Sequence, residues 1–250
     1  MHSDSLQAKQ RRRRFFVILS ICLFIFGATI YQHLERHSYN QAVNDTEVLG
    51  DKISYGDYTL AIEALGGLAV KERVSRDGYA RSNFSSGWGM IDGCDMRNRI
   101  LQRDLADVVM DDDDCTVLAG VLEKDMFSGK RIEFERGPDT SGDIHIEHIV
   151  AVSDAWQKGA QELSYDERYA FFNDPLNLIA IDGPTNMEKG DKDASDWMPR
   201  PAYRCRYVAR QIAIKKRYDL WLDYSEHRAM KQKLQTCPMQ VLPIQEESKQ

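Results

Sequence analysis

The sequence predicts an α+β domain behind an apolar N-terminal segment. Short runs such as 144–150, where Ile144 and Ile146 alternate with polar residues, have the pattern of half-buried strands. In the segment 97–109, by contrast, Ile100 and Leu101 begin an apolar series at helical spacing. With 250 residues, 42% of them hydrophobic and 29% charged, the chain is long enough for a leader and one sizeable core.

The N-terminal segment has the features of an export or anchor signal. Arg11 to Arg14 precede the uncharged run Phe15 to Tyr31, which at about 1.5 Å per residue nearly spans a bilayer core as a helix. Basic residues hold their flank in the cytoplasm, so we expect a single-pass anchor with an extracellular domain; a secreted protein follows if the leader is cleaved. The expected divisions are the anchor 1–31, a polar stalk 32–57, the domain 58–238 and a flexible tail 239–250.

Charge limits how the domain can bind nucleic acid. Residues 1–31 carry five of the 33 basic and one of the 39 acidic residues, which leaves 28 basic and 38 acidic residues and a net charge of about −10. A protein that attracts nucleic acid through its overall field is basic. Binding here must therefore depend on a local patch and a bridging cation. The run Asp111–Asp114 is interpreted as a solvated turn rather than a calcium loop.

The cysteines indicate disulfides in an oxidising compartment. Cys22 lies in the leader, and the exterior part holds an even number, namely Cys94, Cys115, Cys205 and Cys237. They form no CxxC pair, which favours disulfides over a zinc site. Three connectivities are possible, and adjacency in sequence suggests Cys94 with Cys115 and Cys205 with Cys237.

The sequence of the first half of the domain predicts two helices followed by three strands. The expected helices are 58–65, ended by Gly66-Gly67, and 97–109; the expected strands are 115–122, 131–136 and 144–150.

The sequence of the second half predicts a helical insert, one more strand and then three helices. The helix 152–158 is closed by Gly159, and Ser164 with Glu167 forms a capping box for a helix that stops at Asn173-Asp174-Pro175. The strand 177–181 leads into a helix that begins near Thr185 or Asn186, and the last helices are 203–221 and 225–235. In the first of these, Lys215 to Arg217 are expected on a solvated face.

One group of residues suggests hydrolysis of phosphodiesters. A Glu147-His148 pair ends a strand, and Asn177 and Asn186 follow. A one-metal hydrolase needs a base and oxygen ligands for a hard cation, which His148, Glu147 and Asn186 can supply. Structural roles compete with this interpretation, since Asn177 can support a turn and Asn186 can cap a helix.

Three blocks resemble exported bacterial HNH endonucleases of the ββα-metal type, the group that includes the DUF1524 or GmrSD C-terminal domain. The blocks are IHIEHIVAVSDAW, FFNDPLNLIAIDGPTNMEKGDKDASDWMP and CRYVARQIAIKKRYDLWL, and the resemblance extends over Leu60 to Cys237. It implies a ββα-metal core with a helical insert, flanking helices and a small antiparallel sheet. It also implies metal-dependent cleavage of nucleic acid, DNA rather than RNA.

The resemblance implies a role for each matching residue. His148 stands at the position of the general base and Asn177 at that of the asparagine that steadies it. Glu147 and Asn186 stand at the metal-ligand positions, and Lys189 and Lys192 follow as phosphate contacts. Mg²⁺ is the expected cation. Mn²⁺ is an alternative, because relatives most often have Asp at the position of Glu147.

Two other functions fit the sequence. One is an inactive relative that binds metal or nucleic acid. The other is a zinc hydrolase using His145, Glu147 and His148, which strand alternation disfavours because it points the two histidines to opposite faces. The partners expected are a nucleic-acid substrate and, through the N-terminal segment, a membrane; the sequence indicates no obligate protein partner.

Overall fold

The computed structural model describes residues 59–243, together with positions 27 and 30. Residues 59–243 belong to the second of the two units into which the chain divides, Met1–Asp45 and Thr46–Gln250. The predicted stalk, and the predicted anchor apart from those two positions, lie outside the described residues. Within the described part, no helix has the length and apolar character needed to cross a membrane.

Helices and short strands alternate along the domain and confirm the α+β class. The helices are α2 (Ala61–Gly66), α3 (Met96–Asp104), α4 (Val152–Ala155), α5 (Tyr165–Asn173), α6 (Gly183–Lys189), α7 (Arg204–Arg217) and α8 (Tyr224–Leu234). The strands are β1 (Met90–Ile91), β2 (Cys94–Asp95), β3 (Ala106–Met110), β4 (Val117–Leu122), β5 (Ile132–Glu135), β6 (Ile144–His148) and β7 (Leu178–Asp182).

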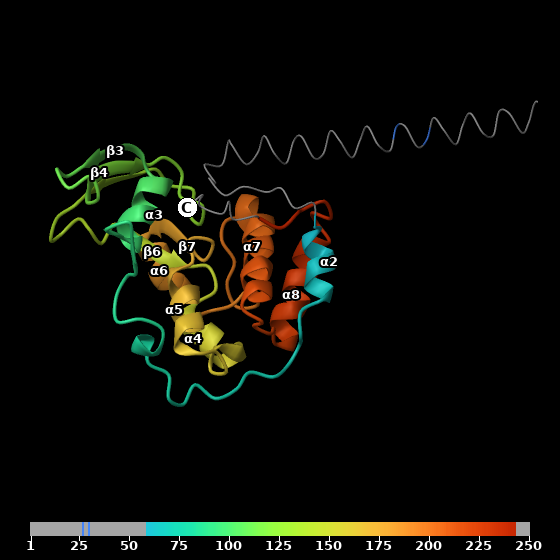
Figure 1. Ribbon diagram of the computed structural model, residues 1–250. Coiled ribbons are helices and arrows are strands. Elements are labelled where there is room, and N and C mark those ends of the chain that lie inside the picture. The colour runs from blue at the N-terminus through green and yellow to red at the C-terminus, as the bar shows by residue number, and fades with distance from the viewer. Residues whose placement is uncertain (1–26, 28–29, 31–58, 244–250) are drawn as a thin grey trace, which may run out of the picture. The chain divides into compact units, whose positions relative to one another are not determined.

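The strands form small antiparallel sheets. Strand β4 pairs with β3 and β5, and β6 pairs with β7 in a register that sets Ile144 opposite Asp182 and Glu147 opposite Ile179. Helices α2, α7 and α8 pack together at one side of the domain, the three-stranded sheet lies at the other, and β6, β7 and α6 lie between them (Figure 1). The helix α6 follows β7 directly and packs on both strands of the β6–β7 pair.

Strand β6 has two different faces. Ile144, Ile146 and His148 are buried, whereas His145 and Glu147 are only half-buried. The two isoleucines pack with residues of α3, β4 and β7 in one hydrophobic cluster. Because side chains alternate along a strand, this packing turns His145 and Glu147 toward the opposite side.

The prediction of one helix over 97–109 is wrong at its C-terminal end. The helix α3 stops at Asp104, Leu105 is extended, and the next five residues form β3. Two β-branched residues, Val108 and Val109, favour a strand, and Val109 pairs with Ala119 of β4. Cross-strand pairing therefore overrides the helical spacing.

The predicted helical insert is confirmed, with one irregular turn. In the capping box, Ser164 Oγ accepts from the Glu167 N–H, and the Glu167 carboxylate accepts from the Ser164 N–H at 2.7 Å. The helix predicted over 152–158 is regular to Ala155, and the chain is kinked within Trp156–Ala160, where Lys158 and Gly159 have non-helical backbone angles. Gly159 lies there at φ 122°, and a Cβ would stand 3.2 Å from the Trp221 ring. The positive φ favours glycine, and a Cβ would in addition crowd the indole.

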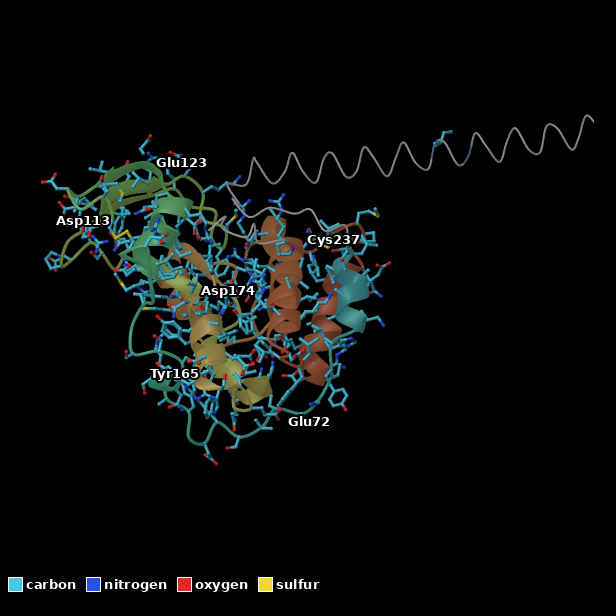
Figure 2. All side chains as sticks on the ribbon, in the orientation of Figure 1. Glu72, Asp113, Glu123, Tyr165, Asp174 and Cys237 are labelled. Atoms are coloured by element: carbon cyan, nitrogen blue, oxygen red, sulfur yellow. A yellow bond between two sulfur atoms is a disulfide. The ribbon has the colours of Figure 1, made fainter. Side chains whose placement is uncertain are left out.

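Both suggested disulfides are present, Cys94 with Cys115 and Cys205 with Cys237. The first ties β2 to the loop before β4. The second ties the first turn of α7 to the residues just after α8, where Figure 2 marks Cys237. The Asp111–Asp114 run is an exposed turn, as predicted, and Figure 2 shows Asp113 at the far edge of the domain.

The expected solvated face of α7 is only partly solvated. Lys216 and Arg217 are exposed, but Lys215 is fully buried, and its ammonium lies 3.0 Å from Glu226 Oε2 and 3.5 Å from Asp154 Oδ2. The prediction for Lys215 is therefore wrong. Its buried charge is balanced by acids from α4 and α8, which the helical pattern of α7 alone does not reveal.

Candidate active site

The paired strands β6 and β7, together with α6, form a ββα unit that positions the polar side chains of the site. The chain passes from β7 into α6 through Asp182, whose carboxylate caps the helix by accepting from the Thr185 N–H at 3.0 Å. Lys130 lies 3.1 Å from the same carboxylate. The start of α6 is therefore fixed against the end of β7 by charge and capping together.

Two contacts join β6 to α6 on the half-buried face. The side-chain amide of Asn186 lies 3.1 Å from His145 Nδ1, and the Lys189 ammonium lies 2.6 Å from Glu147 Oε1. His145 and Glu147 are two apart on the strand, and Asn186 and Lys189 are three apart on the helix, so each pair shares one face. The structure thus brings four polar side chains to one surface of the ββα unit.

Lys189 is placed to neutralise Glu147 rather than to meet solvent. Its side chain is fully buried, and its ammonium also lies 3.3 Å from the His148 carbonyl oxygen. This position corrects the expectation that Lys189 contacts phosphate, because the ammonium is already committed to buried acceptors. Lys192 is exposed and donates to the Glu188 carbonyl at 2.7 Å.

His148 lies on the other side of β6. Its Nε2 is 2.8 Å from the Phe172 carbonyl oxygen, its ring stacks on Trp88, and only 3% of its surface is exposed. Burial, followed by the positive charge of Arg81, lowers the pKa of His148 to about 3. The predicted base His148 and the predicted metal ligand Glu147 thus lie on opposite sides of β6, because a strand directs neighbouring side chains to opposite sides.

Asn177 supports the backbone after β6. Its Oδ1 accepts from the Val150 N–H at 2.9 Å and its carbonyl accepts from the Ile149 N–H at 2.7 Å. The side chain is fully buried. It fixes the segment that follows His148 and makes no hydrogen bond to the imidazole itself within residues 59–243.

The half-buried face contains suitable donors for a divalent cation. Glu147 offers a carboxylate, and its Oε2 has no hydrogen-bond partner among the described residues, while Asn186 offers an amide oxygen and His145 an imidazole nitrogen. Carboxylate and amide oxygens suit hard cations, and imidazole suits transition ions. The nearby Lys189 ammonium opposes a second positive charge. The residues thus fit a cation, in competition with that lysine.

A separate cluster of three carboxylates already surrounds a lysine ammonium. Carboxylate oxygens of Asp193, Asp223 and Glu226 lie within 4.8 Å of one another. The buried ammonium of Lys158 lies 2.6 Å from Asp193, 3.2 Å from Asp223 and 2.6 Å from Glu226. Lys158 therefore takes the place that a metal ion would need, and the cluster is a structural ion network.

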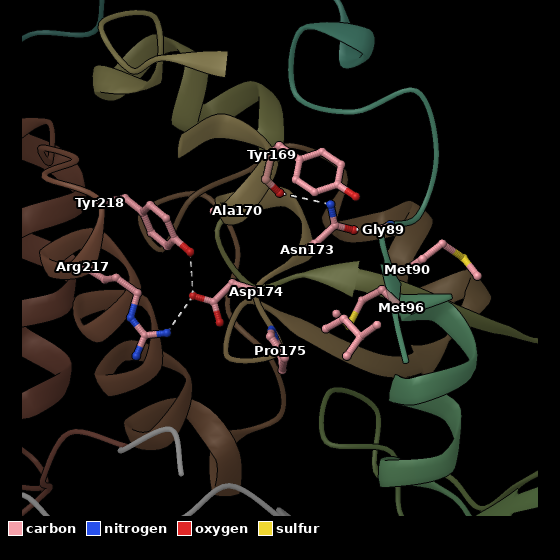
Figure 3. A pocket seen from close by; sticks show the side chains of 11 residues that line it. Gly89, Met90, Met96, Tyr169, Ala170, Asn173, Asp174, Pro175, Arg217 and Tyr218 are labelled. Carbon is pink, nitrogen blue, oxygen red and sulfur yellow. Dashed lines mark hydrogen bonds and ion pairs between the residues drawn. The ribbon is translucent and has the colours of Figure 1, made fainter. Parts of the chain in front are cut away.

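A surface hollow of about 360 Å³ lies between the start of α3 and the ends of α5 and α7 (Figure 3). Its polar groups satisfy one another: Arg217 and the Tyr218 hydroxyl donate to Asp174 at 2.8 and 2.9 Å. Burial and the charge of Asp174 raise the pKa of Tyr218. With these groups paired, the hollow presents mainly apolar surface and no reactive group.

Sequence reasoning missed two residues near the site, Trp88 and Arg81, and named His145 as a ligand only in the zinc alternative. His145 had a signal, because a side chain two positions from Glu147 on a strand shares its face. Trp88 and Arg81, which cover and polarise His148, lie about 60 residues earlier in an irregular segment, and no local pattern marks them.

Known proteins resemble the chain over most of the described region. Residues 95–233 match the family model described as GmrSD restriction endonucleases, C-terminal domain. A protein of Arthroderma benhamiae (strain ATCC MYA-4681 / CBS 112371), named an uncharacterized secreted protein, is 34% identical over 178 residues, which cover 69% of this chain and 82% of that protein. No solved structure matches the chain.

Proposed function

Because this chain belongs to the family of the C-terminal domain of GmrSD restriction endonucleases, we propose that it is a metal-dependent endonuclease of the HNH type that hydrolyses phosphodiester bonds in nucleic acid. One observation carries the proposal: β6, β7 and α6 bring Glu147 and Asn186 to one half-buried face. Family membership supports the nuclease class, and this ββα arrangement supports the HNH type.

Glu147 and Asn186 are the proposed cation ligands. In such a site Mg²⁺ or Mn²⁺ would neutralise charge on the phosphate and the leaving oxygen. Lys189 holds the Glu147 carboxylate in place through their 2.6 Å contact, and Asn177 fixes the backbone beyond β6. These two residues position the site without touching the substrate.

His148 is the proposed proton acceptor. A carbonyl oxygen can only accept, so the contact with Phe172 requires that Nε2 carry the hydrogen and Nδ1 keep its lone pair. The lowered pKa keeps the ring neutral at pH 7, as a base must be, but it also makes the base weak. An anionic phosphate nearby would raise that pKa. Two features oppose this role in the described conformation: Trp88 covers the ring, and β6 directs it to the face opposite Glu147. The indole and the end of β6 must therefore both shift before His148 can reach a cation-bound phosphate.

DNA is the proposed substrate, with RNA as the competitor. The acidic balance of the chain excludes attraction through its overall charge, so affinity depends on the cation and on local cations such as Arg81 and Lys192. The similar protein of Arthroderma benhamiae is named as secreted, and two disulfides suit an oxidising compartment; we therefore propose an extracellular location. The membrane anchor stays a prediction.

Plasmid cleavage tests the function. The purified full chain is incubated with supercoiled DNA or RNA and with each divalent chloride, beside Glu147→Gln, His148→Ala and, as a remote control, Asp113→Asn. We expect cation-dependent nicking of DNA, unchanged by the control and reduced at least about a hundredfold by loss of the base. Equal nicking by wild type and His148→Ala would exclude His148 as the base.

A non-catalytic binding module is the second candidate, and the Glu147–Lys189 ion pair favours it, because an ammonium already satisfies the carboxylate without a metal. If this candidate is right, the protein will bind DNA stably in the plasmid assay but leave the plasmid intact with every divalent cation. The zinc hydrolase using His145, Glu147 and His148 loses support, since His148 lies behind the strand from the other two.

A further inference from the structure

We infer that His145 is a third protein ligand of the cation, and that the site therefore prefers a first-row transition ion such as Mn²⁺ to Mg²⁺. The inference rests on the proposed function for the existence of the cation site. It adds a residue, and a metal class, that the resemblance does not assign.

The contact between His145 and Asn186 carries the inference. Within residues 59–243, His145 Nδ1 and the Asn186 amide are each other's sole hydrogen-bond partners, 3.1 Å apart. Two neighbouring ligand atoms of an octahedral ion with bonds of about 2.1–2.2 Å are separated by about 3 Å. The pair already has the spacing of adjacent ligands, and rotating the amide by 180° presents its oxygen in place of its nitrogen.

The backbone near His145 leaves space for the ring beside α6. A Cβ at Gly183, the first residue of the helix, would stand 3.3 Å from His145 Nε2 and 2.4 Å from the Gly142 carbonyl oxygen. Only glycine permits this approach. The imidazole is thus held between the helix start and the Asn186 side chain, on the same face as Glu147.

The donor set then determines the metal preference. Carboxylate and amide oxygens alone suit Mg²⁺, whereas an imidazole nitrogen favours Mn²⁺, Co²⁺, Ni²⁺ or Zn²⁺. The Lys189 ammonium on Glu147 weakens the carboxylate as a ligand by competing for it. A nitrogen ligand compensates for that loss in the case of a transition ion, but much less for Mg²⁺.

Pulsed electron paramagnetic resonance with MnCl₂ tests the assignment directly. The full chain is loaded with Mn²⁺, and the spin-echo modulation from a directly bound imidazole ¹⁴N is recorded. We expect the modulation in wild type and in the control His227→Ala, and its loss in His145→Ala together with a fall in Mn²⁺ affinity of about ten- to a hundredfold. His145→Asp, which restores an oxygen ligand, should bind cations without the ¹⁴N signal and shift the preference toward Mg²⁺.

The outcomes separate this inference from the function on which it rests. If Mn²⁺ binds and Glu147→Gln abolishes both binding and nicking, but wild type has no ¹⁴N modulation, His145 is not a ligand and the nuclease proposal stands. If wild type neither binds Mn²⁺ nor nicks DNA, both fail. Should His145→Ala not fold, selective broadening of the His145 imidazole resonances in wild type on addition of MnCl₂ decides the case, and its absence overturns the inference.

Discussion

The Lys189 ammonium lies 2.6 Å from Glu147 Oε1, so the carboxylate proposed to bind a cation already has a buried partner of opposite charge. Any metal at this face must share Glu147 with the lysine. Because α6 carries both Lys189 and Asn186, the same helix supplies a competitor and a ligand. In the proposed cation site, the position of α6 against β6 would therefore set the affinity.

Replacing Lys189 by glutamine should tighten cation binding. The change removes one positive charge beside the site and releases Glu147 Oε1, so we expect the affinity for the cation to rise by about tenfold, which is about 1.4 kcal/mol. Titration calorimetry with MnCl₂ on wild type and variant measures it. Lys192→Gln is the matched control, because it also removes a positive charge but its ammonium contacts the Glu188 carbonyl. Equal tightening in both variants would show that Lys189 does not compete for Glu147.

Protonation of His148 should make the domain less stable in mild acid. Its pKa is about 3 in the folded protein and 6.5 otherwise, so between these values the unfolded chain holds one more proton at this position. Its contribution is intact above pH 6.5 and falls as the pH drops, by about 1.4 kcal/mol per pH unit and about 2–3 kcal/mol by pH 4.5 or so.

Urea unfolding of wild type and His148→Gln across this pH range measures the effect. Other groups titrate in both proteins, so the difference between the two curves isolates His148. We expect the wild type to lose more stability than the variant as the pH falls below 6.5. Parallel curves would mean that the imidazole accepts protons in the folded protein as readily as in the unfolded chain.

Adjacent lysines on α7 should respond very differently to the same substitution. Lys215→Met removes a buried ammonium that lies 3.0 Å from Glu226 and leaves that carboxylate undercompensated, at a cost of about 3–5 kcal/mol. Lys216 is exposed, and Lys216→Met should change the unfolding free energy by less than about 0.5 kcal/mol. Thermal and chemical unfolding of both variants supply the comparison, and similar losses would contradict the buried network.

Much of the fold could be predicted because its signals are local. The Ser164–Glu167 capping box and the alternation in β6 lie within a few residues, and both are present as expected. The strand β3 was missed because its pairing partner, Ala119 opposite Val109, lies in another segment. The burial of Lys215 was missed for a similar reason, since its partner Asp154 is 61 residues away.

The candidate site shows the same limit. Adjacency in sequence suggested that Glu147 and His148 act together, yet period-two alternation sends neighbouring strand residues to opposite faces and instead groups Glu147 with His145. The rule that separates His145 from His148 therefore separates Glu147 from His148 as well. The covering of His148 by Trp88 depends on tertiary packing, which no local pattern encodes.

The disulfide between Cys205 and Cys237 should contribute strongly to the stability of the α2–α7–α8 side of the domain. It closes a loop with a sequence separation of 32, and restricting an unfolded loop of that length is worth about 3–4 kcal/mol. The double variant Cys205→Ser/Cys237→Ser removes the bridge without leaving a free thiol, and urea unfolding under oxidising conditions measures the loss. Reduction with dithiothreitol should lower the unfolding free energy of the wild type more than that of the variant, because the variant has only the Cys94–Cys115 bridge to lose. A loss below about 1 kcal/mol would mean that residual contacts between the α7 and α8 segments already restrict this loop in the unfolded chain.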